Sequence, residues 1–530
     1  MIKSFMYLIL FLIFFPKYDC YKILVFNHVF VSSHSNFMVK IANLLSDAGH
    51  NVTIIQSPMN KEIDDSNIKG PKIVAPSKRN PDIDAKSSVL NRVNEQSWTQ
   101  NNENPIDIIN ELKDTSEWLA SSCEHTIKDP NLTVKMREEN FDLGISEIFA
   151  PCGLGVLKYY NVRNTITVSS GAYFDSNYAA LGLPVPVSQL STTIAPLPQE
   201  MNMFERLINL ISFMAEKKVY NDALEVGNAV FKKVYPEGQI DLHKLFKETA
   251  YFIINSDPLV SYGTPSTPKF LQLGGFLNSN PKPLSEKWNK LLNERKTNVL
   301  VSFGSIVKPS KMTNNMKNNL FRLFKEHPNI TFLCKYDEKR PELLNKVDNV
   351  YIYKWLPQYD LLADPRLNLF VTHGGMNSLL EAAKFGVPML DIPLFGDQSK
   401  NAKTVEELKL GRSISKYDFD KDYDKLKNVF NDLMNNKIYL DTSKKISLMM
   451  AQRPYDPKTL FLKYVEFAAK FGRIDHFTIP GADIPYWKFL YIDVMTIFIG
   501  TLCLIFFITK MVIKNIKKIF FNNKKNQKID

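Results

Sequence analysis

The segment FVTHGGMNSLLEAAKFG, residues 370–386, decides the fold. The apolar run before its glycine pair predicts a buried strand, and the apolar spacing after the pair predicts a helix. His373 lies in the turn between them, and Asn377 and Ser378 open the helix. Ligands of parallel α/β sheets bind beyond the carboxyl ends of the strands, so the segment predicts a binding site at this turn.

The mouth of this helix combines groups that suit two parts of one ligand. The first N–H groups of a helix lack partners and lie at its positive end, which favours a phosphate. The glycine pair ending at Gly375 allows close approach, and His373, Asn377 and Ser378 add side-chain donors. Glu381, one turn deeper, would repel a phosphate but suits two adjacent hydroxyls, as on a ribose. The combination predicts a nucleotide site, whereas an ordinary capped helix with a solvated Glu381 is the alternative for this segment alone.

The rest of the chain repeats the strand–helix alternation. Residues 21–27, 36–48 and 51–56 predict a β-α-β unit, and therefore a right-handed crossover and a parallel sheet. Further strands are predicted at 298–303, 330–336, 349–353, 367–372 and 388–392. The stretch between the two groups, 256–288, is rich in proline, glycine and serine, which places a domain boundary near residue 280. No G-x-G-x-x-G fingerprint follows a strand, which disfavours a nicotinamide oxidoreductase.

Two segments flank the glycine turn and extend the nucleotide-sugar pattern. In KWLPQYDLL, the Trp355 ring can stack on a base and the Gln358 amide can hydrogen-bond a nucleoside. In PLFGDQSKN, Asp397 and Gln398 follow the next strand and can bind sugar hydroxyls. The combined pattern W-x-P-Q, H-G-G-x-N, E and P-x-x-x-D-Q resembles the signature of the UDP-glycosyltransferases of the animal glucuronosyltransferase type, which have the two-lobed GT-B fold.

The resemblance implies which residues of the C-terminal half bind UDP-sugar. Trp355 would stack on uracil, Gln358 would contact the nucleoside and Glu381 would bind ribose, while Asp397 and Gln398 would hold the transferred sugar. The residues expected on the diphosphate are Ser305, His373, Gly375, Asn377 and Ser378. Ser378 stands where many vertebrate members have glycine, and it keeps a donor at the helix mouth.

The resemblance also implies a catalytic pair in the N-terminal half. His34, in VSSHSNFMVK, lies on the ligand side of the first strand, just before the helix, where the family has its general base. Neutral imidazole suits this task near pH 7. Glu147, in FDLGISEIFAPCG, stands where the family has the aspartate that orients the base. Its extra methylene puts the hydrogen-bond geometry in question, with Asp142 as the substitute.

The two ends of the chain indicate a membrane protein. A basic start, the apolar run 5–15 and Pro16 predict a secretory signal cut near Cys20. The apolar run 494–509 is followed by seven lysines and one aspartate, which predicts a membrane span with a cytosolic tail. These lysines carry much of the net charge of +11, so the body is nearly balanced and nucleic-acid binding is disfavoured.

The predicted architecture is an α/β, GT-B fold with two Rossmann-like lobes facing a cleft and a C-terminal transmembrane helix. The predicted parts are a signal peptide (1–20), an acceptor-binding lobe with the base (21–280), a UDP-sugar-binding lobe (281–485), a membrane helix (489–509) and a basic tail (510–530). The expected location is the endoplasmic reticulum membrane, as a single-pass type I protein with its body in the lumen.

The predicted activity is transfer of a hexose or glucuronic acid from UDP-sugar to a small lipophilic hydroxyl acceptor, with inversion. UDP-sugar is a substrate, and no cofactor or metal is expected. The alternative is a non-catalytic, UDP-sugar-binding membrane protein of the same fold. The donor sugar, the acceptor, homo-oligomerisation and the pairing of Cys123, Cys152 and Cys334 stay open. The apolar segment 201–216 predicts a helix for core or domain packing, with a membrane-facing or hydrophobic-substrate surface as the alternative.

Overall fold

The computed structural model describes most of the 530-residue chain. The described residues are 19–60, 63–78, 83, 96–99, 105–171, 175–182, 185–195, 197–198, 200–278, 280–345, 347–479 and 484–526. They divide into one large unit, Met1–Thr478, and a second unit, Ile479–Asp530. Residues 1–18 of the predicted signal peptide lie outside the described residues.

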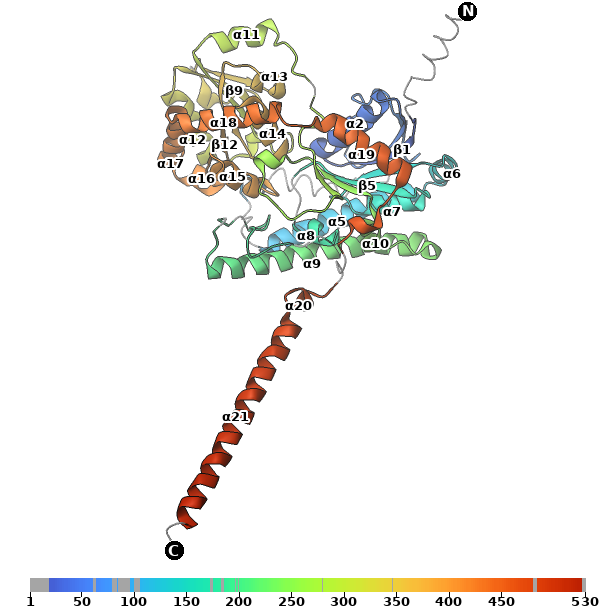
Figure 1. Cartoon of the computed structure of the whole chain (residues 1–530). Helices are drawn as coiled ribbons and strands as arrows, with labels where there is room; N and C mark the ends of the chain where they lie inside the picture. Colours follow the sequence, from blue (N-terminus) through green and yellow to red (C-terminus); the bar gives the residue numbers. More distant parts are fainter. Residues whose placement is uncertain are drawn as a thin grey trace, which may run out of the picture. The chain divides into compact units, whose positions relative to one another are not determined.

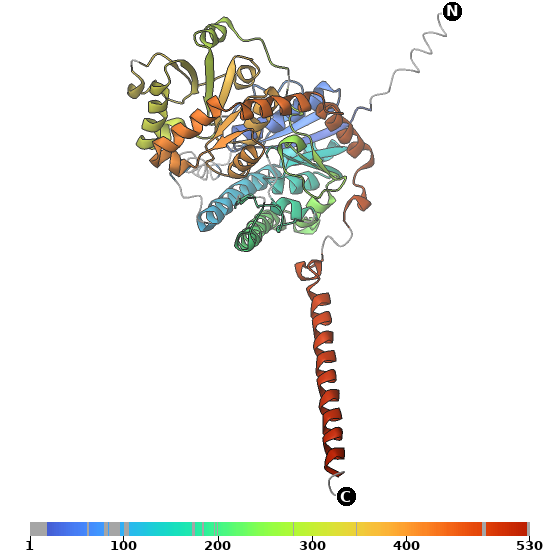
Figure 2. The ribbon, with the colours of Figure 1, turned by 60° about the vertical axis from the view of Figure 1, so that its left-hand side comes forward.

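The first half of the large unit is built on a seven-stranded parallel sheet in the order β3-β2-β1-β4-β5-β6-β7. Its strands are β1 (Lys22–Val29), β2 (Asn51–Pro58), β3 (Lys72–Val74), β4 (Leu143–Glu147), β5 (Asn164–Ser169), β6 (Tyr251–Ile254) and β7 (Phe270–Gln272). Its helices are α2 (Ser32–Asp47), α5 (Pro105–Ile127), α6 (Pro130–Glu138), α7 (Cys152–Tyr159), α8 (Asp175–Ala180), α9 (Met203–Val234) and α10 (Leu242–Glu248). Figures 1 and 2 show α5 and α9 side by side along this lobe.

The second half is built on a six-stranded parallel sheet in the order β10-β9-β8-β11-β12-β13. Its strands are β8 (Thr297–Ser302), β9 (Ile330–Lys335), β10 (Val350–Tyr353), β11 (Leu367–Thr372), β12 (Met389–Asp391) and β13 (Gly411–Ser413). Its helices are α11 (Glu286–Asn293), α12 (Asn314–Glu326), α13 (Gln358–Leu362), α14 (Met376–Phe385), α15 (Gln398–Glu407), α16 (Lys416–Lys421), α17 (Tyr423–Asn435) and α18 (Lys437–Ala451). These two parallel sheets confirm the predicted α/β class with two Rossmann-like lobes.

Each sheet has a point where the order of the strands reverses. In the first sheet this point lies between β1 and β4, and in the second between β8 and β11. The connections from such neighbouring strands leave in opposite directions, so a crevice opens beyond their carboxyl ends. The predicted site residues follow these strands in both sheets.

The last helix of the large unit, α19 (Pro457–Phe471), returns to the first lobe. Phe461, Val465 and Ala468 are fully buried in the core formed by β1, β4, β5 and α2. Figure 1 shows α19 beside α2 and β1. The predicted boundary at residue 485 therefore assigns to the second lobe a helix that packs in the first. The sequence of α19 predicts a helix with one buried apolar face, but it does not show which of the two sheets that face covers. The boundary could therefore not be placed correctly from the sequence.

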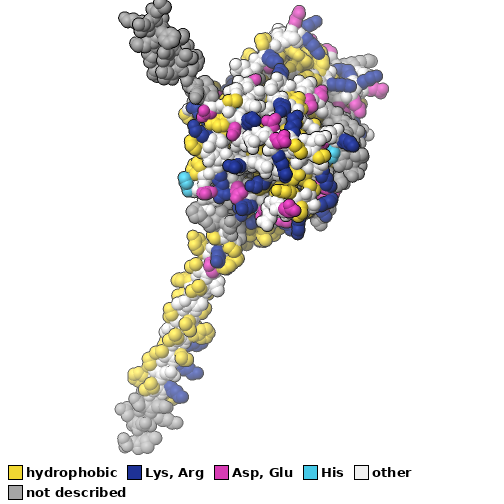
Figure 3. All heavy atoms as spheres, turned by 90° about the vertical axis from the view of Figure 1, so that its right-hand side faces the viewer, with side chains coloured by type: hydrophobic (Ala, Val, Ile, Leu, Met, Phe, Trp, Pro, Cys, Tyr) yellow, Lys and Arg dark blue, Asp and Glu magenta, His cyan; other side chains and the backbone are white. Residues whose placement is uncertain are grey.

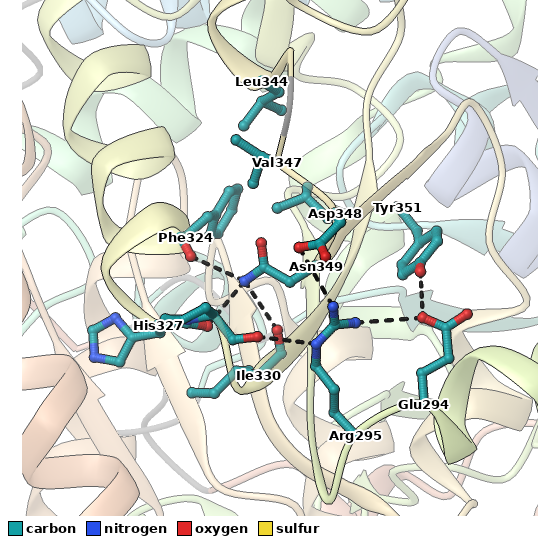
Figure 4. Close-up of polar contacts among 12 residues, drawn as sticks. Glu294, Arg295, Phe324, His327, Ile330, Leu344, Val347, Asp348, Asn349 and Tyr351 are labelled. Carbon is teal, nitrogen blue, oxygen red and sulfur yellow. Dashed lines mark hydrogen bonds and ion pairs between the residues drawn. The ribbon is translucent and has the colours of Figure 1, made fainter.

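A polar network fixes the amino-terminal edge of the second sheet (Figure 4). The buried Asn349 side chain donates to the backbone carbonyls of Phe324, His327 and Ile330 at 2.9–3.1 Å. Arg295 donates to the Pro328 carbonyl at 2.9 Å. Buried polar groups need such partners to offset the loss of water. This edge lies at the opposite end of the strands from the predicted site.

The structure settles two local features that the sequence left open or placed differently. Cys123 of α5 and Cys152 of α7 form a disulfide, while Cys334 is buried and free. The sequence predicts a loop at Asn131, the acceptor of the sequon Asn131-Leu132-Thr133, because it follows Asp129-Pro130. The structure instead places the exposed Asn131 in the first turn of α6.

The second unit contains α20 (Tyr486–Phe489) and the long helix α21 (Ile492–Asn526). The part of α21 from residue 492 to residue 521 is a helical segment that is long and apolar enough to cross a membrane. Figure 3 shows apolar side chains along much of this helix and lysines toward its far end. The helix starts three residues later than predicted and continues through most of the predicted tail. Tyr491, with a φ of 56°, separates it from the aromatic residues of α20.

Candidate active site

Three adjacent strand ends of the first sheet bring together His34, Glu147 and Ser170. His34 lies in the first turn of α2, just after β1, whereas the sequence placed it before the helix. Its Nδ1 lies 2.7 Å from Glu147 Oε1 at the end of β4. Ser170, after β5, donates its backbone N–H to the same oxygen at 3.1 Å and places its hydroxyl 3.0 Å from His34 Nδ1. The longer glutamate side chain therefore reaches the imidazole.

The electrostatics of this pair suit a base held ready for a proton. Burial favours neutral His34, but the charge and hydrogen bond of Glu147 outweigh it and raise the pKa of His34. Burial favours protonated Glu147, but His34 and Ser170 together lower the pKa of this carboxyl. Because a carboxylate only accepts hydrogen bonds, neutral His34 carries its proton on Nδ1 and the lone pair on Nε2. The imidazole can then accept a proton from a ligand at Nε2.

Apolar rings flank the imidazole. Phe30 and Phe149 stack with ring centroids 5.7 Å apart, and each lies 5.1 Å from the His34 ring. Phe30 also belongs to a buried cluster with Trp118 and Met59. Phe30 is buried, whereas Phe149 is partly exposed, so the apolar surface that a bound molecule could contact beside His34 comes from Phe149.

In the second lobe, the glycine turn holds the His373 ring at the mouth of α14. A Cβ atom on Gly304 or Gly375 would lie within 2.8 Å of His373 Nε2, so a side chain at either position would displace the imidazole ring. Gly304 and Gly374 also have φ angles of 79° and 78°, which favour glycine. Gly375 is the N-cap of α14 and Ser378 is buried in its first turn. Burial and the charge of Lys335 lower the pKa of His373 to about 4, so its ring is neutral and can donate one hydrogen bond.

Trp355 and Lys335 form one wall beside this turn. The Trp355 side chain is 74% exposed, which leaves a ring face for stacking. Lys335 ends β9, and its Nζ lies 5.3 Å from the Trp355 ring centroid and donates to the Gly304 carbonyl at 2.8 Å. Ser305, the next residue of this loop, is exposed. A cation therefore lies between the ring predicted to hold the base and the turn predicted to hold the phosphates.

Gln358 and Glu381, both predicted to contact the nucleoside, lie together. Gln358 Nε2 donates to Glu381 Oε2 at 2.8 Å and lies 3.5 Å from Ser378 Oγ. Burial raises the pKa of Glu381, and the bond from Gln358 opposes the rise. The hydrogen bond between the two side chains therefore orients each of them.

Asp397 and Gln398 lie at the start of α15. Gln398 Oε1 accepts the backbone N–H groups of Leu394 and Phe395 at 2.9 and 3.1 Å, so this oxygen holds the preceding loop. Asp397 accepts a bond from Asn401 at 3.1 Å. The negative charge of Asp397 also contributes to the raised pKa of His34. The predicted sugar-binding carboxylate of one lobe therefore lies near the predicted base of the other.

Direct contacts join the two lobes around the site. Asn255, which follows β6, donates to Asn377 Oδ1 of α14 at 2.7 Å. A Cβ on Gly171 would lie 3.2 Å from Asp397 Oδ2. These contacts bring the carboxyl ends of the two sheets face to face, as the two-lobed prediction requires.

Three residues of this arrangement are not predicted from the sequence: Ser170, Asn255 and Lys335. Each immediately follows or ends a strand on the ligand side of its sheet. That position was the available signal for Lys335, since it places a cation at the ligand-side end of the strand predicted at 330–336. Serine and asparagine are common in loops, so the sequence alone gave no reason to select Ser170 or Asn255.

One group of potential metal ligands occurs among the described residues, and it lies in the first lobe. It consists of His28, Cys123 and Cys152, which are all buried. The two cysteines form the disulfide, and burial lowers the pKa of His28 to about 3. The sulfur atoms lie 3.8 and 3.9 Å from His28 Nε2. With its sulfurs bonded to each other, this group lacks the thiolates that a metal would need.

The arrangement of the lobes is that of the GT-B glycosyltransferases. The chain is similar to the glycotransferase of kitacinnamycin, with a TM-score of 0.56, 15% identity and coverage of 84% of this chain and 99% of that chain. It is also similar to the glycosyltransferase VinC in complex with dTDP, with a TM-score of 0.53 and 16% identity over 84% and 99% of the two chains. These similarities show the fold.

The chain belongs to the UDP-glucoronosyl and UDP-glucosyl transferase family, whose model matches residues 21–527. It is 30% identical over 419 residues to the putative UDP-glucuronosyltransferase ugt-56 of Caenorhabditis elegans, covering 76% of each chain. It is 27% identical over 400 residues to UDP-glucuronosyltransferase 1A7 of Mus musculus, covering 74% of this chain and 72% of the relative. The protein is therefore a UDP-glycosyltransferase, an enzyme that transfers sugar from UDP-sugar, and the predicted family and fold are confirmed.

Proposed function

We propose that the enzyme transfers a sugar from UDP-sugar to a small lipophilic alcohol or phenol with inversion, using His34 as the general base. The observation that carries this proposal is the 2.7 Å contact between His34 Nδ1 and Glu147 Oε1, with Asp397 of the other lobe close enough to influence His34. A carboxylate-oriented imidazole with Nε2 available has no evident use in a protein that only binds UDP-sugar. The partly exposed Phe149 ring beside His34 favours a lipophilic acceptor.

In the proposed mechanism, His34 Nε2 accepts the acceptor hydroxyl proton while the oxygen attacks the anomeric carbon. Glu147 stabilises the imidazolium that forms, as in other carboxylate–histidine pairs. Attack from the face opposite UDP inverts the anomeric configuration. Charge develops on the leaving diphosphate, where the start of α14, His373 and Lys335 offer donors and positive potential. Trp355, Gln358 and Glu381 would bind the nucleoside, and Asp397 and Gln398 the transferred sugar.

The donor sugar we favour is a neutral hexose. A glucuronate carboxylate would need a cation near the start of α15. Lys400 is the first cation of this helix, but its Nζ lies 3.3 Å from Asp175, a buried carboxylate of the other lobe. Its charge is therefore already balanced, which favours a hexose over glucuronic acid.

The proposed location is the endoplasmic reticulum membrane, with the body in the lumen and the lysine-rich end in the cytosol. The lysines that follow the apolar part of α21 support this orientation, since positive residues stay on the cytosolic side.

A donor competition assay tests the proposed function. Membranes containing the full chain would receive UDP-glucose and UDP-glucuronic acid together with a simple phenol, and the product would be identified by mass and by the coupling constant of its anomeric proton. We expect a β-linked hexoside from the α-linked donor. A glucuronide would overturn the donor assignment alone. An α-linked product would overturn inversion, and the absence of product with a broad panel of phenols and steroids, despite UDP binding, would favour the non-catalytic alternative.

Glu147→Gln should move the acid limb of the pH–rate profile to lower pH. The base must be neutral, so kcat falls as pH drops through the pKa of His34, which Glu147 raises. Removing the carboxylate charge leaves the effect of burial, which lowers this pKa. Each unit of displacement removes about 1.4 kcal/mol of imidazolium stability. The plateau rate should fall by up to roughly tenfold per unit, because the proton is only partly transferred in the transition state.

In Glu147→Gln, the Ser170 backbone N–H should still bind an oxygen at the position of Glu147 Oε1, so the amide oxygen, and not the amide nitrogen, faces His34 Nδ1. The imidazole then keeps its proton on Nδ1, and the substitution changes the charge at position 147 without changing the tautomer of His34. Asp142→Asn is the matched control, since its carboxylate bonds the Lys22 backbone N–H at the start of β1. If Asp142→Asn moves the acid limb and Glu147→Gln does not, then Asp142 is the carboxylate that raises the pKa of His34.

A further inference from the structure

The first half of α9 exposes a continuous apolar face. Six large apolar side chains on this face are between 50% and 69% exposed. They are Met203, Phe204, Leu207, Ile208, Ile211 and Met214. Their spacing of three and four residues places them along one side of the helix. Six such side chains in one row are more than the scattered apolar residues of an ordinary protein surface.

The rotation of α9 about its axis is fixed by polar contacts on the opposite side. Asn209 is fully buried, donates to the carbonyls of Val187 and Leu190 at 2.7 and 2.8 Å, and accepts the Thr192 N–H at 2.7 Å. One and two turns further on, Phe213 and Glu216 are also buried, and Glu216 accepts the backbone N–H of Ser176 at 2.9 Å. Turning the apolar row inward would break these buried hydrogen bonds, so its exposure is a property of the fold.

The second half of the same helix provides an internal comparison. Along the continuation of the exposed row lie Lys218, Asp222 and Glu225, which are all exposed. Lys218 pairs with Asp222 at 2.8 Å, and Glu225 pairs with His243 at 2.8 Å. This half is therefore an ordinary water-facing helix surface. The change from apolar to charged occurs at Lys217 and Lys218, so the apolar face is confined to one segment.

The chain itself indicates what covers this face. The large unit ends at Thr478, and the apolar helix α21 begins at Ile492. The segment 479–491 can span at most roughly 45 Å, since an extended chain covers about 3.3–3.6 Å per residue. With α21 in a bilayer, the large unit is always within this reach of lipid. Tethering at such short range gives even a weak membrane contact a high effective concentration.

We propose that the apolar face of residues 203–214 docks on the surface of the bilayer that holds α21. Apolar side chains would enter the boundary between headgroups and acyl chains, as in amphipathic helices that lie on membranes. The exposed Lys217 and Lys218 at the end of the face would lie at headgroup level, with their aliphatic stems along the apolar surface and their charged ends in water. Capping by Asn202 and Glu205 holds the first turn of the helix, so Met203 and Phe204 are presented on ordered backbone.

Fluorescence quenching in nanodiscs tests this proposal on the full chain. Bimane would be attached to Phe204→Cys, Ile208→Cys or Ile211→Cys, with Asp222→Cys and Glu225→Cys as matched controls on the same helix. The exposed Cys20 and Cys503 would be replaced by serine. Quenchers would be nitroxide lipids in discs of phosphatidylcholine with one-fifth phosphatidylserine, and iodide in the buffer. We expect nitroxide lipids to lower the emission at the three apolar positions by roughly twofold, and iodide to quench only the two controls.

A second measurement guards against an effect of labelling. Phe204→Glu with Leu207→Glu, on the exposed face, should abolish lipid quenching of bimane at Ile211→Cys without changing the thermal unfolding of the protein. Asp222→Ala with Glu225→Ala should leave that quenching unchanged. Equal quenching at all five positions, or none at the apolar ones, would overturn the proposal. Protection from iodide without quenching by nitroxide lipids would indicate a protein partner or a second copy of the chain, and would overturn it too.

Discussion

His34→Ala is expected to lower kcat by about 10²–10⁴-fold, the usual contribution of a general base. The substitution removes the only group we assign to accept the acceptor proton, while UDP-sugar would still bind to the other lobe. We therefore expect the affinity for UDP, measured by calorimetry on the full chain in detergent, to stay within about twofold of wild type. The loss should appear in kcat, measured as glycoside formation in membranes at saturating donor and acceptor.

The matched control for this substitution is His476→Ala, which removes an exposed histidine in the stretch after α19. It should leave kcat and UDP affinity unchanged. Retention of more than a tenth of the wild-type kcat in His34→Ala would contradict the assignment of the base. If both proteins bind UDP and neither forms product with any donor, the non-catalytic alternative gains support instead.

Much of the architecture follows from the pattern of apolar residues. The strand predicted at 298–303 is β8 at 297–302, and the strand predicted at 367–372 is β11 with the same bounds. Such strands are buried on both faces, so their apolar runs are continuous and end sharply at polar or glycine residues. The helix predicted at 201–216 is α9, which extends to residue 234. Its second half was missed because its exposed side is charged and its apolar pattern is weaker.

The parts of the candidate site that lie within one contiguous stretch of sequence could be predicted from the residues alone. The glycine turn and its helix form a contiguous stretch, so the relation of His373 to the start of α14 was evident from the sequence. The pairing of His34 with Glu147 joins residues 113 positions apart. It arises because β1 and β4 are parallel neighbours whose carboxyl ends coincide, and only the family resemblance pointed to it. The roles of these residues in catalysis stay predictions.

Lys335→Met is expected to lower kcat/KM by on the order of 10²–10³-fold, comparable to removing one strong stabiliser of transition-state charge. Lys335 ends β9 beside Trp355 and holds the Gly304 carbonyl next to His373. Its positive charge lowers the pKa of His373, so the electrostatic influence of the lysine reaches the turn expected to hold the diphosphate. Charge on that diphosphate would increase as the sugar leaves, and a cation at this position would then stabilise the transition state more than bound UDP-sugar.

The measurement is glycoside formation under low donor concentration, together with UDP affinity by calorimetry at two salt concentrations. Lys335→Arg keeps the charge and should retain most of the activity, whereas Lys335→Met should weaken UDP binding less than it lowers kcat/KM. Lys325→Met removes an exposed lysine near the end of α12 and serves as the control. If Lys335→Met matched this control within about twofold, the diphosphate would have to be stabilised by α14 and His373 alone. In that event Lys335 would serve only to hold the loop that carries Gly304 and Ser305.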